Sequence, residues 1–140
     1  MKIMVIGSMA FVKDMVKIQK QLEKHGHIVF LPIGSEPHLK DSLFVDDLEK
    51  NLEFCIKDNI MRRNFNQVEK SDGVLVVNHK RNNTDGYIGI SALLEMGIAH
   101  HLGKKIFLYN NVPNYNSVRW AHEVMIMQPT IINGDLKKIK

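Results

Sequence analysis

Glu95 is the side chain of this sequence best placed to do chemistry. It lies in an apolar helical segment beside Leu94 and Met96, and its neighbours one helical turn away, Ser91 and Ala99, are small. Small neighbours leave room above the carboxylate for a ligand, and loss of hydration raises the pKa of a buried carboxyl group. Such a group suits a nucleophile or a general acid or base. The alternative is an exposed glutamate on the outer face of the helix.

Polar residues in three further segments are expected to meet Glu95 at one edge of the protein. Gly7 and Ser8 follow the first apolar segment, and the segments 78–89 and 109–116 follow two others. The candidate substrate-binding residues in these segments and in the Glu95 helix are Gly7, Ser8, Asn78, Asp85, Gly89, Ser91 and Asn110. For Ser8 the alternative is a simple helix cap, and for Asp85 an Asp-Gly turn.

Apolar runs and helical periodicity alternate along the chain and predict how these residues are positioned. Strands are expected at 1–7, 28–31, 74–77, 106–109 and 130–132. Helices are expected at 11–24, at 46–68 with a break near 58–59, at 88–102 and at 118–127, with a polar loop at 34–40. This order predicts one three-layer α/β domain over residues 1–140, with a five-stranded, mainly parallel sheet. In such sheets ligands bind beyond the carboxyl ends of the strands.

Composition excludes several other classes of protein. The chain has 140 residues, is 44% hydrophobic and carries a net charge of +4, so it can bury an ordinary core. A single cysteine, Cys55, excludes an internal disulfide and a cysteine zinc cluster, and no metal site or cofactor is expected. No apolar run is long enough for a membrane span. We therefore expect a reduced, cytoplasmic protein, and the scattered charge makes nucleic acid a weak candidate partner.

Standard nucleotide motifs are absent, but three segments carry a family resemblance. The segments are Val5–Ser8, Ser71–Asn78 and Gly89–Ala99, the last followed by Gly-Lys and a strand at Gly103–Ile106. Together they resemble the nucleoside 2-deoxyribosyltransferase superfamily, which includes the deoxynucleoside 5'-monophosphate N-hydrolases. The resemblance runs from Met1 to about Asn110 and implies a Rossmann-like or flavodoxin-like fold.

The resemblance also implies a reaction. In the family the glutamate that matches Glu95 attacks the anomeric carbon of a 2-deoxyribosyl group, and water or a second base resolves the covalent intermediate. By the same resemblance Gly7 and Ser8 lie beside the sugar or its 5'-phosphate, and Ser91 lies where a phosphate or hydroxyl binds. Family members are usually dimers or larger homo-oligomers, so the resemblance implies a nucleoside or nucleotide as ligand and a second copy of the chain as partner.

Two positions depart from the family pattern. Asn64 stands where members usually carry an aspartate, and Gly89 stands where transferases tend to carry another. Both departures weaken the case for a transferase. The sequence therefore predicts either cleavage or transfer of an N-glycosidic bond through Glu95, or a module that binds a nucleotide-derived ligand without cleaving it.

Overall fold

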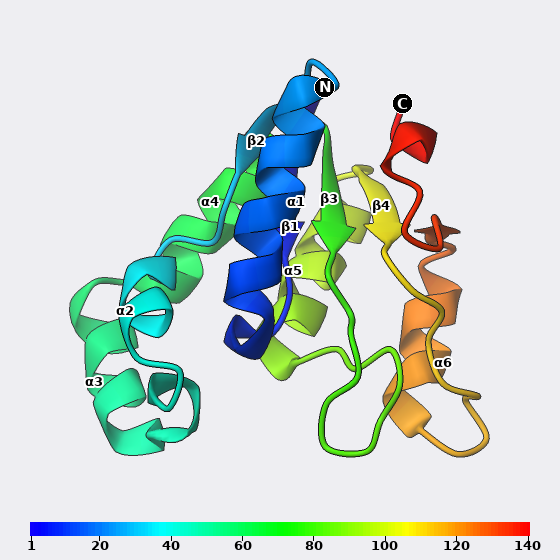
Figure 1. Ribbon diagram of the computed structural model, residues 1–140. Coiled ribbons are helices and arrows are strands. Elements are labelled where there is room, and N and C mark those ends of the chain that lie inside the picture. Colours follow the sequence, from blue (N-terminus) through cyan, green and yellow to red (C-terminus); the bar gives the residue numbers. More distant parts are fainter.

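A five-stranded, all-parallel sheet forms the centre of the protein in the computed structural model, which describes residues 1–140 (Figure 1). The strand order is β2-β1-β3-β4-β5. The strands are β1 (Lys2–Ile6), β2 (Ile28–Phe30), β3 (Gly73–Val76), β4 (Lys105–Leu108) and β5 (Thr130–Ile131). The predicted α/β class and five-stranded sheet are confirmed, and the architecture agrees with a Rossmann-like or flavodoxin-like fold.

Alternating side chains of the strands form two separate cores, one on each face of the sheet. Ile3 and Val5 of β1 pack on the side of α1, whereas Met4 and Ile6 pack on the opposite side. The helices are α1 (Val12–Lys24) on the first face, and α4 (Ile60–Lys70), α5 (Ile90–His101) and α6 (Arg119–Ile126) on the second (Figure 1). Strands covered on both faces are apolar throughout, which explains why they were recognisable as continuous apolar runs.

The segment after β2 differs from the prediction. The expected loop at 34–40 is instead the short helix α2 (Ser35–Lys40), which leads through a 3₁₀ turn (Phe44–Asp46) into α3 (Leu48–Lys57). Pro37 does not prevent this helix, because it lies in the first turn, where backbone N–H groups have no intrahelical partner. The predicted break near 58–59 is confirmed, since Asn59 adopts a left-handed conformation with φ 51° between α3 and α4.

The strand order reverses between β1 and β3. The chain passes from β1 outward to β2 and then returns across β1 to add β3 on the other side. The loops that follow these strands diverge at this point and leave a crevice beyond the carboxyl ends of the strands. Helices α2 and α3 lie together beyond the end of β2 and extend this side of the molecule (Figure 1). The crevice is therefore the place to look for a ligand site.

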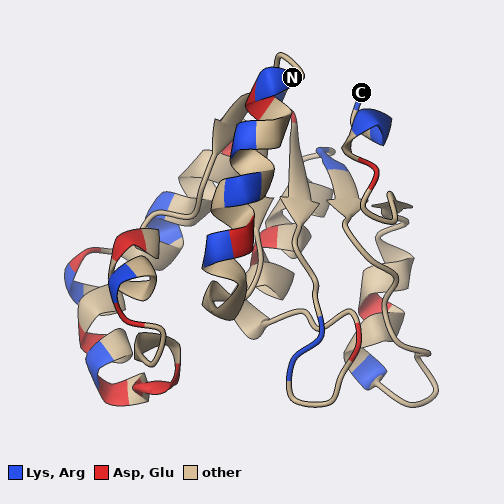
Figure 2. Ribbon diagram, in the orientation of Figure 1, with Lys and Arg blue, Asp and Glu red and all other residues tan.

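Charged side chains of both signs are spread over the surface (Figure 2). Basic residues recur along the outer face of α1, while acidic and basic residues alternate over α2 and α3. None of the helices has both the length and the apolar character needed to cross a lipid bilayer.

Candidate functional site

A cavity of about 320 Å³ lies at the crevice where the strand order reverses. Its walls come from the loops after β1 and β2, from α2 to α4, and from the first two turns of α5. We call it the Glu95 cavity. Five of the predicted site residues line it, namely Gly7, Ser8, Gly89, Ser91 and Glu95. Glu95 and Ser8 therefore line the same cavity.

Glu95 is an almost fully buried carboxyl group of the cavity. Its side chain is 6% exposed, and it projects from the face of α5 that also carries the buried Ala92 and Ala99. Burial raises the pKa of Glu95 to about 8, and no neighbouring charge or hydrogen bond offsets this effect. The small residues keep space around the carboxyl group, so a ligand entering the cavity can approach it.

Gly7 and Ser8 form the turn that brings the end of β1 to the cavity. A Cβ atom on Gly7 would lie 2.6 Å from the carbonyl oxygen of Val77, so only glycine fits between β1 and β3 at this point. Ser8 caps the 3₁₀ turn that follows, because its Oγ accepts a hydrogen bond of 3.3 Å from the backbone N–H of Ala10. Ser8 therefore both caps the 3₁₀ turn and lines the cavity.

Arg81 is a cavity residue that the sequence did not single out. Its Nη1 donates a 3.1 Å hydrogen bond to Ser8 Oγ, and its Nη2 lies 2.8 Å from Asp46 Oδ1. The guanidinium carbon stands 5.8 Å from the centre of the Tyr87 ring. Asp46 is largely exposed, at 74%, so its pairing with Arg81 is weakened by solvent. Arg81 thus places a positive charge beside Ser8 at the cavity wall.

His38 is the second cavity residue that was not expected. It is 6% exposed on α2, and its ring packs edge-on against Phe44 with the centroids 4.8 Å apart. Its Nδ1 is fully enclosed and has no hydrogen-bond partner. Burial lowers the pKa of the imidazole below its usual value, so the ring is neutral at pH 7. Since the segment 34–40 was expected to be a loop, nothing in the sequence indicated that its histidine would be buried at a cavity.

Asn64 also lines the cavity, but its amide is already occupied. The backbone N–H of Ile33 donates to Asn64 Oδ1 at 2.7 Å, and Asn64 Nδ2 donates to the carbonyl oxygen of Ile33 at 3.3 Å. The side chain therefore holds the loop after β2 against α4. An aspartate could accept the first of these bonds but could not donate the second. Asn64 therefore makes two hydrogen bonds to the backbone of Ile33, and an ionised aspartate at this position could make only one of them.

Asn78 and Asn110 lie outside the lining of the Glu95 cavity and bind each other. Asn78 Nδ2 donates to the Asn110 carbonyl oxygen at 2.9 Å, and the Asn110 N–H donates to Asn78 Oδ1 at 2.8 Å. Asn110 Nδ2 donates in turn to the Asn78 carbonyl oxygen at 3.1 Å. This reciprocal pairing ties the loop after β3 to the loop after β4. The predicted role of both residues in substrate binding stays a prediction.

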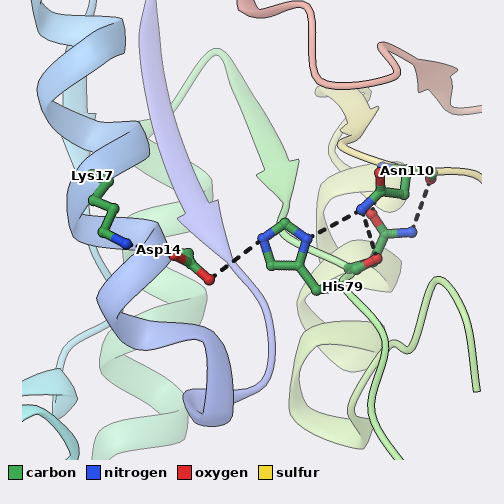
Figure 3. A network of polar contacts seen from close by, with 5 residues as sticks. Asp14, Lys17, His79 and Asn110 are labelled. Atoms are coloured by element: carbon green, nitrogen blue, oxygen red, sulfur yellow. Dashed lines mark hydrogen bonds and ion pairs between the residues drawn. The ribbon is translucent and has the colours of Figure 1, made fainter. Parts of the chain in front are cut away.

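A second depression lies on the α1 side of the sheet, and the network of contacts runs from Asn110 through His79 to Asp14 beside it (Figure 3). His79 Nδ1 lies 3.2 Å from Asn110 Nδ2, and its Nε2 lies 3.7 Å from Asp14 Oδ2. Because an amide NH₂ can only donate, Nδ1 accepts and the ring hydrogen is on Nε2. We call this depression of about 550 Å³ the His79 groove. It is lined by Phe11, Asp14, Lys17, Ile18, Gln21, His79, Lys80 and Tyr109.

Asp85 lies outside both depressions. Its side chain is 87% exposed, and its nearest charged partner is Lys80, at 3.9 Å. The loop that carries it closes with an antiparallel bridge between Arg81 and Thr84. The arrangement agrees with the turn alternative, and the predicted contact with a ligand hydroxyl stays a prediction.

Comparisons with known proteins do not assign the chain to a family. No protein-family model matches it, and no curated protein matches it. The structure also contains no cluster of three or more His, Cys, Asp or Glu side chains that could hold a metal ion. The functional argument therefore depends on the chemistry of the cavity.

Proposed function

We propose that the Glu95 cavity binds a nucleoside or nucleotide and that Glu95 cleaves or transfers its N-glycosidic bond. The observation that carries the proposal is the placement of an unpaired, buried carboxyl group beside Ser8, in a cavity at the point where the strand order reverses. Binding sites for small molecules have volumes from about 300 Å³ upward, which the cavity meets.

The chemistry of a retaining glycosidase fits a carboxyl group in this position. The carboxylate attacks the anomeric carbon, the base departs, and a glycosyl ester forms that water or a second base then resolves. Small neighbours, such as Ala92 beside Glu95, leave space for the sugar. Because burial favours the protonated form of Glu95, its proton must move elsewhere before it attacks.

A positive charge in the cavity wall also favours the binding of an anionic substrate. Arg81 is one of the lining residues, and its hydrogen bond to Ser8 holds the two side chains next to each other in the cavity wall. Arginine binds phosphate oxygens through a planar pair of donors. A nucleoside 5'-monophosphate would therefore gain a charged contact that a nucleoside lacks.

The test is a panel of ribonucleosides, deoxynucleosides and their 5'-monophosphates, with free base measured by chromatography. We expect base release by the parent chain and a loss of about 1,000-fold or more in Glu95→Ala, as for removal of a nucleophile elsewhere. Glu69→Ala, which removes an exposed glutamate of α4, is the matched control and should keep the parent rate. Equal rates in Glu95→Ala and the parent would contradict the mechanism.

A second candidate function is binding without cleavage. It is favoured by Asn64, whose amide is held by Ile33 and supplies no acid where the resembling family carries an aspartate. A ligand that prefers the folded state raises the apparent stability of a protein. A nucleotide that raises the thermal unfolding midpoint and is recovered intact would support this second function over the first.

We further propose that the chain forms a homo-oligomer. Helix α3 has no buried residue, and Leu48, Leu52 and Ile56 lie one turn apart on it with exposed fractions of 76%, 62% and 71%. Exposed apolar side chains that adjoin one another are typical of protein contacts. Leu48 also lines the Glu95 cavity, so a second copy of the chain at this helix would lie at the cavity mouth. Sedimentation equilibrium tests the proposal, and a monomer at all concentrations would contradict it.

A further inference from the structure

His38 is the one side chain with a buried nitrogen that lacks a hydrogen-bond partner. Its Nδ1 is enclosed against the protein, so Nε2 is the ring nitrogen left to exchange a proton with the Glu95 cavity. An unpaired buried polar atom costs stability, by about 1–3 kcal/mol. Such a cost at a cavity wall indicates that the imidazole is kept there for a use other than packing.

Three other polar residues of the cavity, Asn64, Cys55 and Arg81, already have partners. Asn64 is bound to the backbone of Ile33, and the Cys55 thiol donates to Asn51 Oδ1 at 3.2 Å. Burial also raises the pKa of Cys55, which keeps its proton in place. Arg81 donates hydrogen bonds to Ser8 and Asp46, and its guanidinium group lies over the Tyr87 ring. Of the carboxyl, imidazole and thiol groups that line the cavity, His38 and Glu95 are the two without a hydrogen-bond partner.

We propose that His38, in the reaction proposed above for Glu95, is the acid that protonates the departing base. A carboxylate oxygen of Glu95 forms a bond to the anomeric carbon, and the bond from that carbon to the base nitrogen breaks. The electron pair of the broken bond stays with the base, which takes the proton from His38 Nε2. The products of this step are a glycosyl ester on Glu95, a neutral base and a neutral imidazole.

One proton on the pair is enough for this step. In the free protein burial keeps the proton on Glu95 and leaves the His38 ring uncharged. Transfer of that proton to His38 creates the carboxylate nucleophile and the imidazolium acid together. The enclosed Nδ1 makes the imidazolium costly to hold, which makes it a stronger acid toward the base.

The second step restores both residues. Water attacks the anomeric carbon of the ester, and the neutral His38 ring takes the proton that the water loses. The bond between the sugar and the Glu95 oxygen breaks, so the carboxylate is regenerated. The imidazolium and the carboxylate again hold one proton between them, and the sum of the two steps is hydrolysis of the N-glycosidic bond.

The test compares two substrates whose bases need different help to depart. The base of 2'-deoxyguanosine must be protonated, whereas 7-methyl-2'-deoxyguanosine already carries a positive charge and releases a neutral base. Both are used as nucleosides and as 5'-monophosphates. In His38→Gln we expect a loss of about 100-fold or more in kcat on the first substrate and a change within about threefold on the second, as for removal of a general acid. Glu95→Gln should lose both activities.

Two further variants keep the test valid if His38→Gln folds poorly. His38→Phe preserves a ring against Phe44 and removes the unpaired nitrogen, so its thermal unfolding midpoint should not fall below that of the parent. It should show the same difference between the two substrates. His101→Gln, which changes an exposed histidine at the end of α5, should match the parent on both substrates.

Each possible outcome decides the proposal. A loss confined to 2'-deoxyguanosine in a folded variant supports His38 as the acid. An equal loss on both substrates, or no loss on either, overturns it while leaving the Glu95 reaction intact. Failure of the parent chain to release base from either substrate would overturn the proposed function itself, and the role of His38 with it.

Discussion

The Glu95 cavity lies beyond the carboxyl ends of the strands, whereas the His79 groove lies on the α1 side of the sheet, and the polar groups of the two regions differ in whether they have partners. In the groove, the His79 ring has a partner at each nitrogen, since it contacts both Asp14 and Asn110. In the cavity, Glu95 has no offsetting interaction and His38 has an enclosed nitrogen without a partner. The carboxyl and imidazole groups without partners therefore lie in the cavity and not in the groove.

The difference separates a structural network from a candidate reaction site. Buried polar groups are normally satisfied, and Asn78 and Asn110, which adjoin the groove through His79, follow this rule by tying the loops after β3 and β4 together. Unsatisfied groups cost stability and persist where a ligand or a reaction uses them. Removing an unsatisfied group from the cavity should therefore stabilise the protein, whereas removing a paired group from the groove should destabilise it.

The largest effect is expected from Glu95→Gln and depends on pH. A glutamate that ionises at about pH 8 in the folded state, and near 4.5 when unfolded, binds more protons folded than unfolded between these values. Its contribution to the free energy of unfolding therefore falls as pH rises through this window. The variant should gain stability relative to the parent from pH 5 to 8, by up to about 5 kcal/mol.

Urea unfolding of both proteins at each pH measures this difference. The control is Glu69→Gln, whose exposed carboxyl group should give a curve parallel to that of the parent. Parallel curves for Glu95→Gln as well would mean that the carboxyl group is not desolvated in the folded protein.

Removal of the pairing between Asn78 and Asn110 should lower the free energy of unfolding, whereas Glu95→Gln should raise it. Asn110→Ala removes two contacts of the side-chain amide, so the carbonyl oxygen of the fully buried Asn78 and His79 Nδ1 lose this donor, while the Asn78 side chain keeps its bonds to the Asn110 backbone. We expect a loss of about 1–3 kcal/mol in the free energy of unfolding, with the activity of the folded fraction kept. Loss of activity without loss of stability would instead support the predicted substrate contact of Asn110.

Asn64 lines the cavity, but the oxygen and the nitrogen of its side-chain amide both have hydrogen-bond partners. It therefore tests whether the effect of a substitution on stability depends on the position of the residue or on its hydrogen bonds. Asn64→Asp should lose about 1–2 kcal/mol at pH 7, because a carboxylate oxygen would face the Ile33 carbonyl where Nδ2 now donates. Base release should not increase. A more stable or more active Asn64→Asp would show that the amide pairing is dispensable.

The smallest effect is expected at Gly89, which caps the N-terminus of α5. A Cβ at this position would lie 3.7 Å from Ser8 Cβ, an ordinary contact, and the backbone φ of −70° suits any residue. Gly89→Asp should therefore fold and gain a few tenths of a kcal/mol (about 0.3), since aspartate caps helices slightly better than glycine. A loss above about 1 kcal/mol would indicate that the cavity wall is tighter there than the distance implies.

Much of the fold and part of the site could be predicted from the sequence. Buried parallel strands are apolar on both faces, so β1, β3 and β4 stand out, and the rule that ligands bind at the carboxyl ends of strands brings Ser8, Gly89 and Glu95 together. The loop after β2 ends at the same edge, so the same rule could have directed attention to the segment that carries His38.

The remaining features depend on the assembled structure. The pairing of Asn78 with Asn110 spans 32 residues and follows from the register of β3 against β4, which no local pattern reveals. Likewise, the contact of Arg81 with Ser8 spans 73 residues and depends on how the loop after β3 folds back over β1. Whether a polar side chain is free or paired is therefore visible only when distant loops have been brought together.

Trapping of the glycosyl intermediate tests the role of Glu95 most directly. The chain is incubated with a 2'-deoxy-2'-fluoroarabinosyl nucleoside, whose fluorine slows hydrolysis of the ester, and is then examined by intact-mass and peptide-mass analysis. The expected result is one glycosyl unit on the peptide that contains Glu95, and no label in Glu95→Gln. Base release with an unmodified chain, or a label on another residue, would contradict the assignment of Glu95 as the nucleophile.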